Sequence, residues 1–220
     1  MFINETDVQF VLKNQFIQYK DLFIKNFNIQ EYPRDYIFNT AGFSNKGLYY
    51  LVEGTIYVYT TNIYGYVRFM GIHQENTIFN LDSFRDQDDA VITTQAFSSV
   101  KVIPLTIDQI IELSKQDPQL YKDFLIYTAD VLRLMCHDAQ AQSVHDVKTR
   151  FIHFILLYTK NTNSSVIPLS QYRIASAINA SRIQVTRICS ELKQLKLIDI
   201  HRNQIVIIDR ERLAQYSYYL

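Results

Sequence analysis

Hydrophobic positions follow two different periods along this chain, and the change comes near Pro104. Before it, β-branched and aromatic runs are separated by glycines, and all five glycines fall between Gly42 and Gly71. The clearest runs, Leu48–Tyr59 and Tyr66–Met70, predict strands joined by tight turns. Weaker strand patterns occur at 35–38, 89–96 and 100–105. Many short strands at this spacing predict a sandwich, jelly roll or barrel.

Helical periods precede and follow these strands. Over the first 30 residues one helical face collects Val8, Val11, Leu12 and Phe16, which predicts an amino-terminal helix. After Pro104, residues 106–115 predict a short helix.

The segment that Pro118 opens predicts a long helix, because Pro suits a first helical turn and neither Gly nor Pro recurs before Pro168. A helix of about 28 residues is roughly 42 Å long and would overhang a domain of about 115 residues. Its apolar positions are spaced four, three, four and three apart, as in a coiled-coil seam. We therefore predict a dimer helix with the seam Leu120, Phe124, Tyr127, Val131 and Leu134. The alternative is that this face packs on the chain's own domain.

Two short helices and a tight turn are predicted beyond a hinge at Asp146, which can cap a helix over 147–158. Ser170 and Ser181 can cap the two short helices, and Asn179 between them tolerates the left-handed backbone of a sharp turn. The inward faces would be Ile174, Ala175 and Ile178, then Val185, Ile188 and Leu192. Residues 197–208 predict two strands around a turn at Arg202-Asn203. This is the pattern of a winged helix-turn-helix.

The outward face of the second helix carries side chains suited to DNA. Arginine can bind the O6/N7 edge of guanine, and isoleucine can contact a thymine methyl group. Serine and glutamine suit phosphate oxygens. The predicted DNA-binding residues are Gln171, Ser181, Arg182, Ile183, Gln184, Thr186, Arg187 and Ser190. The alternative is an ordinary helix pair with solvated arginines.

Charge supports the DNA interpretation. The chain has 22 Lys/Arg and 22 Asp/Glu, but residues 1–145 hold 11 basic and 17 acidic side chains, a balance of −6. Residues 146–220 hold 11 and 5, a balance of +6. A basic module on an acidic body is expected of an anion-binding end, although chance segregation could also produce it.

Other classes are excluded by what the sequence lacks. Cys136 and Cys189 are too few for a disulfide framework or a four-cysteine metal site. No dinucleotide, Walker or G-x-S-x-G motif occurs, and no histidine pair has metal-ligand spacing, so we expect no metal, no cofactor and no enzyme activity. The start, MFINETDVQF, is not a secretory signal, and no run of apolar residues could span a membrane. We expect a cytoplasmic protein without membrane contact.

The whole chain resembles the Crp/Fnr family of transcription regulators. Leu48–Gly54 resembles the family's strand–glycine motif, the Pro118-led helix its dimer helix, and Ser181–Arg187 its recognition helix. The resemblance implies an α+β fold with a cyclic-nucleotide-binding-like jelly roll over 1–115, a dimerisation helix and hinge over 116–146, and a winged helix-turn-helix over 147–220. The family's two recognition arginines fall on Arg182 and Arg187, its recognition glutamate on Ile183 and its wing phosphate contact on His201.

The positions that hold cyclic AMP in that family differ here. They are Phe79-Asn80, Ala90-Val91 and Met135-Cys136, so the cation that would pair with the cyclic phosphate is missing. We predict that cyclic AMP is not the effector, as in the family's regulators of Listeria virulence and of halorespiration. These six residues could line a pocket for another small effector, or the jelly-roll core could be filled. The iron–sulfur and haem ligands of other relatives are also missing. Both cysteines are predicted to be buried structural thiols, with redox sensing as the alternative.

The sequence therefore predicts a homodimeric regulator, more readily an activator, that reads an inverted repeat in double-stranded DNA. Its effector is other than cyclic AMP, or it needs none, and RNA polymerase is a candidate partner. The rival interpretation is a ligand-binding or protein-interaction module without DNA binding.

Overall fold

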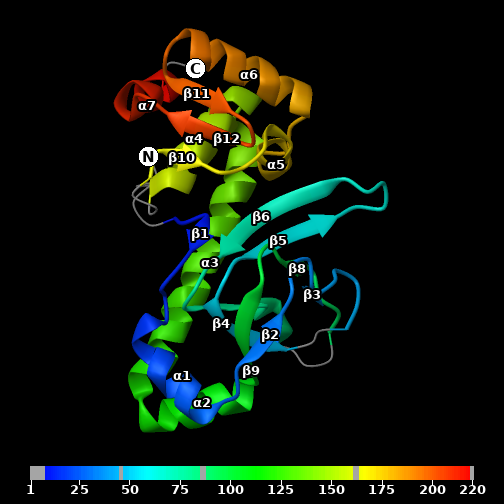
Figure 1. The fold of residues 1–220 in the computed structure, drawn as a ribbon, viewed down its shortest axis with the longest axis vertical. Coiled ribbons are helices and arrows are strands. Elements are labelled where there is room, and N and C mark those ends of the chain that lie inside the picture. Colours follow the sequence, from blue (N-terminus) through cyan, green and yellow to red (C-terminus); the bar gives the residue numbers. More distant parts are fainter. Residues whose placement is uncertain (1–7, 45–46, 85–87, 161–163, 219–220) are drawn as a thin grey trace. The chain divides into compact units, whose positions relative to one another are not determined.

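The computed structural model describes residues 8–44, 47–84, 88–160 and 164–218, and they belong to two compact units (Figure 1). Val11–Leu132 form the first, called the β unit below. Met1–Phe10 and Arg133–Leu220 form the second, called the helical unit. The division falls within the long helix α3 (Pro118–Val144). The three-part division at 115 and 146 stays a prediction.

The β unit is built from two sheets, as the strand patterns predict. One sheet has the order β1 (Val11–Leu12), β6 (Val67–His73), β5 (Ile56–Thr61), β8 (Thr93–Ala96) and β3 (Ile37–Asn39). The other has the order β2 (Gln30–Tyr32), β9 (Val100–Leu105), β4 (Leu48–Glu53) and β7 (Thr77–Phe79). Every pairing is antiparallel except that of β1 with β6. This double sheet is the predicted jelly roll.

The turn between β4 and β5 requires its glycine. Gly54 has φ +103°, and a Cβ placed there would lie 2.6 Å from the carbonyl oxygen of Ser99. Any other residue would need both a strained backbone and a shift of its neighbour. The strand–glycine motif therefore reflects a close approach of two chain segments.

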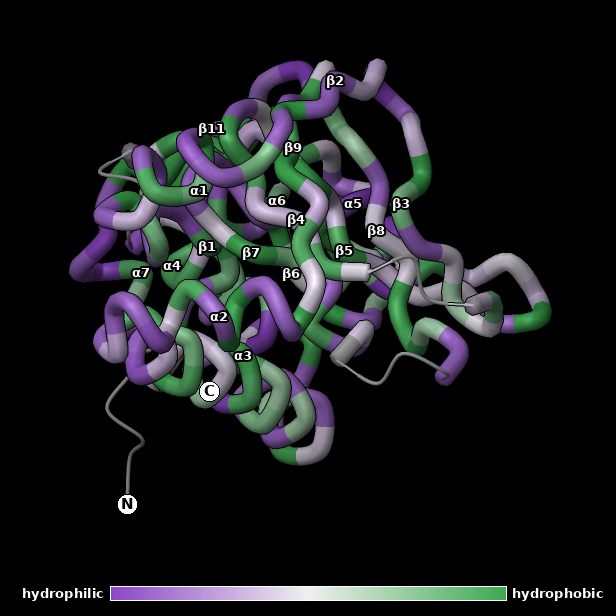
Figure 2. Tube along the Cα trace, turned by 90° about the horizontal axis from the view of Figure 1, so that it is seen from below, coloured by the Kyte–Doolittle hydropathy of each residue, from purple (hydrophilic) through white to green (hydrophobic). Residues whose placement is uncertain are grey.

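The core of the β unit is mainly aromatic. The ring of Phe16 lies 5.1 Å from Tyr127, and that of Phe23 lies 4.6 Å from Tyr50, measured between centroids. This cluster joins η2 (Ile17–Tyr19) and α1 (Lys20–Asn26) to the sheet, to α2 (Ile107–Gln116) and to α3. Short η3 (Leu81–Phe84) follows β7. The hydrophobic colouring of much of β4, β7 and β9 in Figure 2 fits this role as the centre of the unit.

The predicted amino-terminal helix is wrong over its first half. Val11 and Leu12 form strand β1, which runs parallel to β6 with Leu12 opposite His73. Asn14 then adopts a left-handed backbone with φ 65°, which no α-helix could continue through. The helical spacing of apolar residues is real, but a distant strand supplies the pairing that decides the conformation here.

The predicted dimer seam on α3 also needs correction. Leu120, Phe124 and Tyr127 are buried in the core of the β unit, and Val131 packs against that core. This is the alternative in which the helix face covers its own domain. Leu134 is buried as well. A different apolar stripe of α3 is exposed: the side chains of Tyr121, Leu125, Ile126 and Leu132.

The helical unit contains α4 (Val147–Lys160), α5 (Gln171–Ala177), α6 (Arg182–Gln194), α7 (Arg210–Tyr218) and a small sheet. The sheet has the order β10 (Val166–Ile167), β12 (Gln204–Ile207), β11 (Ile198–His201) and is antiparallel. The amino-terminal segment packs here too, because the ring of Phe10 meets Phe154 edge-on at 4.8 Å. The predicted winged helix-turn-helix is confirmed in its elements.

Candidate DNA interface

The turn between α5 and α6 has the backbone that the sequence predicts. Ser170 caps α5, with its Oγ accepting the N–H of Arg173 at 3.3 Å. Asn179 is left-handed with φ 53°, and the N–H of Ala180 then donates to the carbonyl of Ala175 at 2.9 Å. Asparagine adopts this conformation at a lower cost than most residues do. The turn therefore closes without glycine.

Helix α6 begins with a capping box. The Oγ of Ser181 accepts the N–H of Gln184, and the Oε1 of Gln184 accepts the N–H of Ser181 at 2.9 Å. This satisfies two donors that a helix start would otherwise leave free. Both side chains remain exposed, and the amide nitrogen of Gln184 can still donate to a phosphate. On the opposite face Val185, Ile188 and Leu192 are buried, as predicted.

The outward face of α6 is solvent-exposed and lightly bonded. Ile183 is 65% exposed, and Arg182 and Arg187 are exposed as well. Within the described part of the chain, the side chains of these three residues make no hydrogen bond or ion pair. Their contact groups are therefore available to a partner surface.

Three of the predicted contact residues, Thr186 and Ser190 on α6 and Gln171 on α5, are hydrogen-bonded within the protein. The Oγ1 of Thr186 lies within donating distance of the Oε1 of Gln171, 2.8 Å, and of the carbonyl of Arg182, 2.9 Å. The Oγ of Ser190 donates to the carbonyl of Thr186 at 3.0 Å. The structure thus brings Gln171 of α5 beside α6. Gln171 keeps its amide nitrogen as a donor while its oxygen is occupied.

The wing places His201 next to a carboxylate. The Nε2 of His201 lies 3.3 Å from the Oδ2 of Asp199, and the Oδ1 of Asp199 lies 2.8 Å from the Nζ of Lys193. The Lys193 hydrogen bond is the main reason that the pKa of Asp199 is lowered from its ordinary value. A phosphate would therefore have to compete with the Asp199 carboxylate for the imidazole of His201. Arg202 is exposed at the tip of this turn, and the sequence patterns did not mark it as a contact residue.

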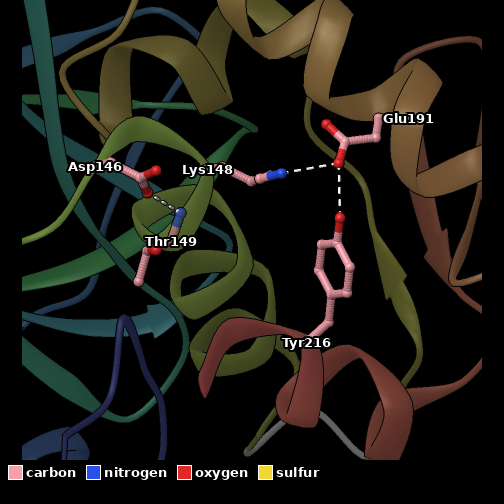
Figure 3. Close-up of polar contacts among 5 residues, drawn as sticks. All are labelled: Asp146, Lys148, Thr149, Glu191 and Tyr216. Atoms are coloured by element: carbon pink, nitrogen blue, oxygen red, sulfur yellow. Dashed lines mark hydrogen bonds and ion pairs between the residues drawn. The ribbon is translucent and has the colours of Figure 1, made fainter. Parts of the chain in front are cut away.

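A polar network fastens α6 from behind (Figure 3). The Oε1 of Glu191 lies 2.8 Å from the Nζ of Lys148 on α4 and accepts the hydroxyl of Tyr216 on α7 at 2.7 Å. The Nζ of Lys148 also lies 5.3 Å from the centre of the Tyr216 ring. The hydrogen bond from Lys148, followed by that from Tyr216, holds the pKa of Glu191 below its ordinary value. Sequence patterns gave no sign of this network, because its members are 25 and 43 residues apart.

Arg150 fastens the turn of the helix-turn-helix to the start of α4. Its Nε donates to the carbonyl of Ile178 at 2.9 Å, and its Nη2 to that of Asn179 at 3.2 Å. Its Nη1 donates to the carbonyl of His145 at 2.8 Å. Asp146 caps α4 as predicted, with its Oδ1 accepting the N–H of Thr149 at 2.8 Å. The segment around Asp146 is therefore bonded directly to the α5–α6 turn.

The six predicted effector-pocket residues are divided between the two units, four in the β unit and two in the helical unit. Phe79 is fully buried and stacks on Tyr49 at 5.3 Å, so it fills the jelly-roll core. Asn80 is buried, and its Oδ1 accepts the hydroxyl of Thr94 at 2.7 Å. Ala90 is buried, whereas Val91 is 70% exposed on the surface. Met135 and Cys136 belong to the helical unit.

The two cysteines differ from each other. Cys189 is buried, and that burial raises the pKa of its thiol to about 12, as expected of a structural thiol. Cys136 is exposed, so the prediction of burial is wrong for this residue. Periodicity placed it on α3 but could not say which face of that helix is buried at this position.

Metal-binding clusters and membrane-spanning helices are both absent from the described residues. These residues contain no group of three or more His, Cys, Asp or Glu side chains arranged to hold a metal ion. They also contain no helix with the length and apolarity needed to cross a membrane.

Comparisons with known proteins agree with this geometry. Residues 149–216 match the model of the Crp-like helix-turn-helix domain. The global nitrogen regulator of Nostoc sp. is 22% identical over 190 residues, which cover 81% of this chain and 84% of that protein. The fold matches a CooA mutant from Carboxydothermus hydrogenoformans with a TM-score of 0.78 at 14% identity, covering 93% of this chain and 99% of that one.

A transcriptional regulator of the CRP/FNR family from Thermus thermophilus has the same fold, with a TM-score of 0.72 at 17% identity over 87% of this chain and 98% of that one. The matched domain, the shared fold over both units and the exposed arginine-bearing helix lead to one conclusion. The chain is a DNA-binding transcription regulator with a Crp-like helix-turn-helix domain, and it has the fold of Crp/Fnr regulators.

Proposed function

We propose that this regulator binds an inverted repeat as a homodimer, with helix α6 of each subunit in a major groove. The observation that carries this proposal is the asymmetry of α6. Its outward residues Arg182, Ile183 and Arg187 are exposed and bond to no other described side chain, while Glu191 and the buried residues hold it from behind. A recognition helix needs such an arrangement, because base edges must find free donors on a helix that does not move.

The exposed stripe of α3 supports the homodimer. Tyr121 and Leu125 are 54% and 53% exposed, and Leu132 is 62% exposed. With Thr128 between them these positions repeat at four, three and four residues, which is a coiled-coil spacing. A second copy of α3 would cover this stripe in place of water. Two subunits would then present their α6 helices to half-sites about 34 Å apart.

The side chains of α6 suggest how the half-site is read. Arg182 and Arg187 suit guanine, Ile183 suits a thymine methyl group, and Gln171, Ser181, Gln184, Thr186, Ser190 and His201 suit the sugar–phosphate backbone. The basic balance of +6 over residues 146–220 supplies the non-specific attraction to phosphates.

The effector is proposed to be other than cyclic AMP. Phe79 fills a position that would have to be open, and Asn80 is fastened to Thr94 inside the core. The likeness to Crp/Fnr regulators supports three further parts of this proposal. The protein activates transcription through RNA polymerase, acts in the cytoplasm and has no enzyme activity.

Selection of genomic or random duplex fragments by the purified, ligand-free protein tests the proposal. We expect a palindromic motif whose binding weakens steeply with added salt. Arg187→Ala should weaken binding by about 10-fold or more and relax the motif at one position of each half-site. Arg212→Ala, which removes an exposed arginine from α7 instead, is the matched control and should leave the motif unchanged.

Enrichment of a single, non-repeated half-site would overturn the dimeric arrangement. If neither the unchanged protein nor Arg187→Ala enriched any fragment at low salt, the rival interpretation, a ligand-binding or protein-interaction module without DNA binding, would be favoured instead.

A further inference from the structure

The helical unit contains a small cavity that the DNA-binding proposal does not use. It has a volume of about 110 Å³ and is formed by the amino-terminal segment, α3, α4 and the start of α7. One part of its wall is apolar: Val8, Leu156 and Leu157. The rest carries basic or imidazole side chains: His137, His153, Lys160 and Arg210. No carboxylate lines it among the described residues.

Arg210 brings a positive charge that no carboxylate of the described residues balances. Its Nη1 donates to the Oγ1 of Thr159 at 2.6 Å, and its Nη2 donates to the carbonyl of Leu156 at 2.9 Å. Both acceptors are neutral, and the described residues offer Arg210 no ion pair. The two bonds hold the guanidinium against α4, so its position is set before anything binds. A fixed guanidinium without a carboxylate partner is a ready site for an anion.

The size and the lining together restrict the ligand. Since a water molecule takes about 30 Å³, the cavity has room for roughly four water molecules or for one ligand of about four to six non-hydrogen atoms. Half of the wall would bury methylene groups, and the other half would pair with a negative charge. An ion such as inorganic phosphate would leave Val8 and Leu157 without a partner.

We infer that this cavity binds a short-chain monocarboxylate. The carboxylate group pairs with Arg210 and Lys160, and the alkyl chain packs on Val8, Leu156 and Leu157. The site lies wholly within the helical unit, and its binding requires neither DNA nor a second subunit. It goes beyond the proposed function, so either can fail while the other stands.

Sodium butyrate is the probe, and butyramide of nearly equal shape without the charge is its control. Full-length protein labelled with ¹³C-histidine is titrated at constant ionic strength. We expect saturable shifts of the His137 and His153 imidazole resonances with butyrate, with no response from His201 on the wing. Butyramide should shift neither resonance. Absence of a saturable shift with butyrate, or an equal response to butyramide, would overturn the inference.

Variants test which positively charged side chain pairs with the carboxylate of butyrate. Arg210→Gln should raise the butyrate dissociation constant by about 10-fold or more, because a charged hydrogen-bond partner is lost. Arg212→Gln, two residues further along the same helix and outside the cavity, should leave the constant unchanged. Lys160→Gln gives a second reading if Arg210→Gln fails to fold. An unchanged constant in every folded cavity variant would show that butyrate binds elsewhere.

Discussion

The two units differ in the burial of a key polar contact. In the β unit, His73 lies inside the core with its Nδ1 3.2 Å from the hydroxyl of Tyr127, which itself donates to the carbonyl of Ile78 at 2.6 Å. In the helical unit, Arg150 and Glu191, which fasten the recognition helix and its turn, are only partly buried. Burial shields a polar group from salt but makes its charged form costly, whereas surface ties remain open to screening.

The contrast suggests two different sensitivities. The β unit should respond to pH through a group that must stay neutral. The helical unit, whose ties position the recognition helix, should respond to loss of individual donors and to ionic strength. The following changes test this contrast in order of expected size.

The largest effect is expected at His73. Burial lowers the pKa of His73 from 6.5 to about 4. The unfolded chain therefore takes up this proton at higher pH than the folded one, and protonation favours unfolding. The stabilisation is complete above pH 6.5 and is lost as the pH falls towards 4. A difference of this size corresponds to about 3 kcal/mol in the free energy of unfolding. Hydrogen exchange of amides in β4 and β9 measures it.

The matched variants for this prediction are His73→Phe and His201→Gln. We expect His73→Phe to remove most of the pH dependence between these limits, whatever it costs in overall stability. His201 is exposed, so its replacement should leave the dependence intact. A full pH response in His73→Phe would mean that another group of the β unit controls it.

A smaller loss is expected from Arg150→Ala in the helical unit. The change leaves the carbonyls of His145, Ile178 and Asn179 without this donor and should cost about 2 kcal/mol. Arg150→Lys should recover only part, because an ammonium group cannot span three separate carbonyls. Denaturant unfolding monitored by exchange of α5 amides provides the measurement. Arg182→Ala removes an unbonded arginine and should cost almost nothing; an equal loss there would contradict the assigned role.

The smallest effect is expected from Glu191→Gln. Lys148 and Tyr216 hold the pKa of Glu191 below its ordinary value of 4.5. The ion pair therefore stabilises the fold fully above pH 4.5, and this stabilisation is lost as the pH falls through the pKa of the folded state. Since Glu191 is partly exposed, the loss at neutral pH should be about 0.5 kcal/mol and should shrink with added salt. Thermal unfolding at two ionic strengths measures it. A loss that does not change with salt would show that shape, not charge, holds α6.

Local signals made the helix-turn-helix predictable from sequence. Ser170, Asn179 and Ser181 act through bonds to residues within a few positions, so the sequence alone contains both partners. The inward and outward faces of α6 follow from helical period in the same way. The two serine caps and the left-handed turn at Asn179 depend on such local chemistry, and the structure confirms all three.

Features that depend on distant partners could not be predicted in this way. The period of α3 identified an apolar face but not what covers it, and Leu120, Phe124 and Tyr127 belong to the β unit's own core. Val11 and Leu12 have helical spacing, yet they form a strand because they pair with β6. Glu191 and Arg150 bond across the fold, and nothing near them in the sequence names their partners.

Three outward side chains of α6, Arg182, Ile183 and Arg187, bond to no other described side chain, and this has a consequence for how the regulator could change over generations. The positions proposed to choose the DNA sequence, 182, 183 and 187, contribute almost nothing to holding the helix in place. Substitutions there should alter target preference at little cost in folding. A library randomised at these three codons should therefore yield mostly folded proteins with new specificities, and a duplicated gene could acquire a new set of targets in few steps.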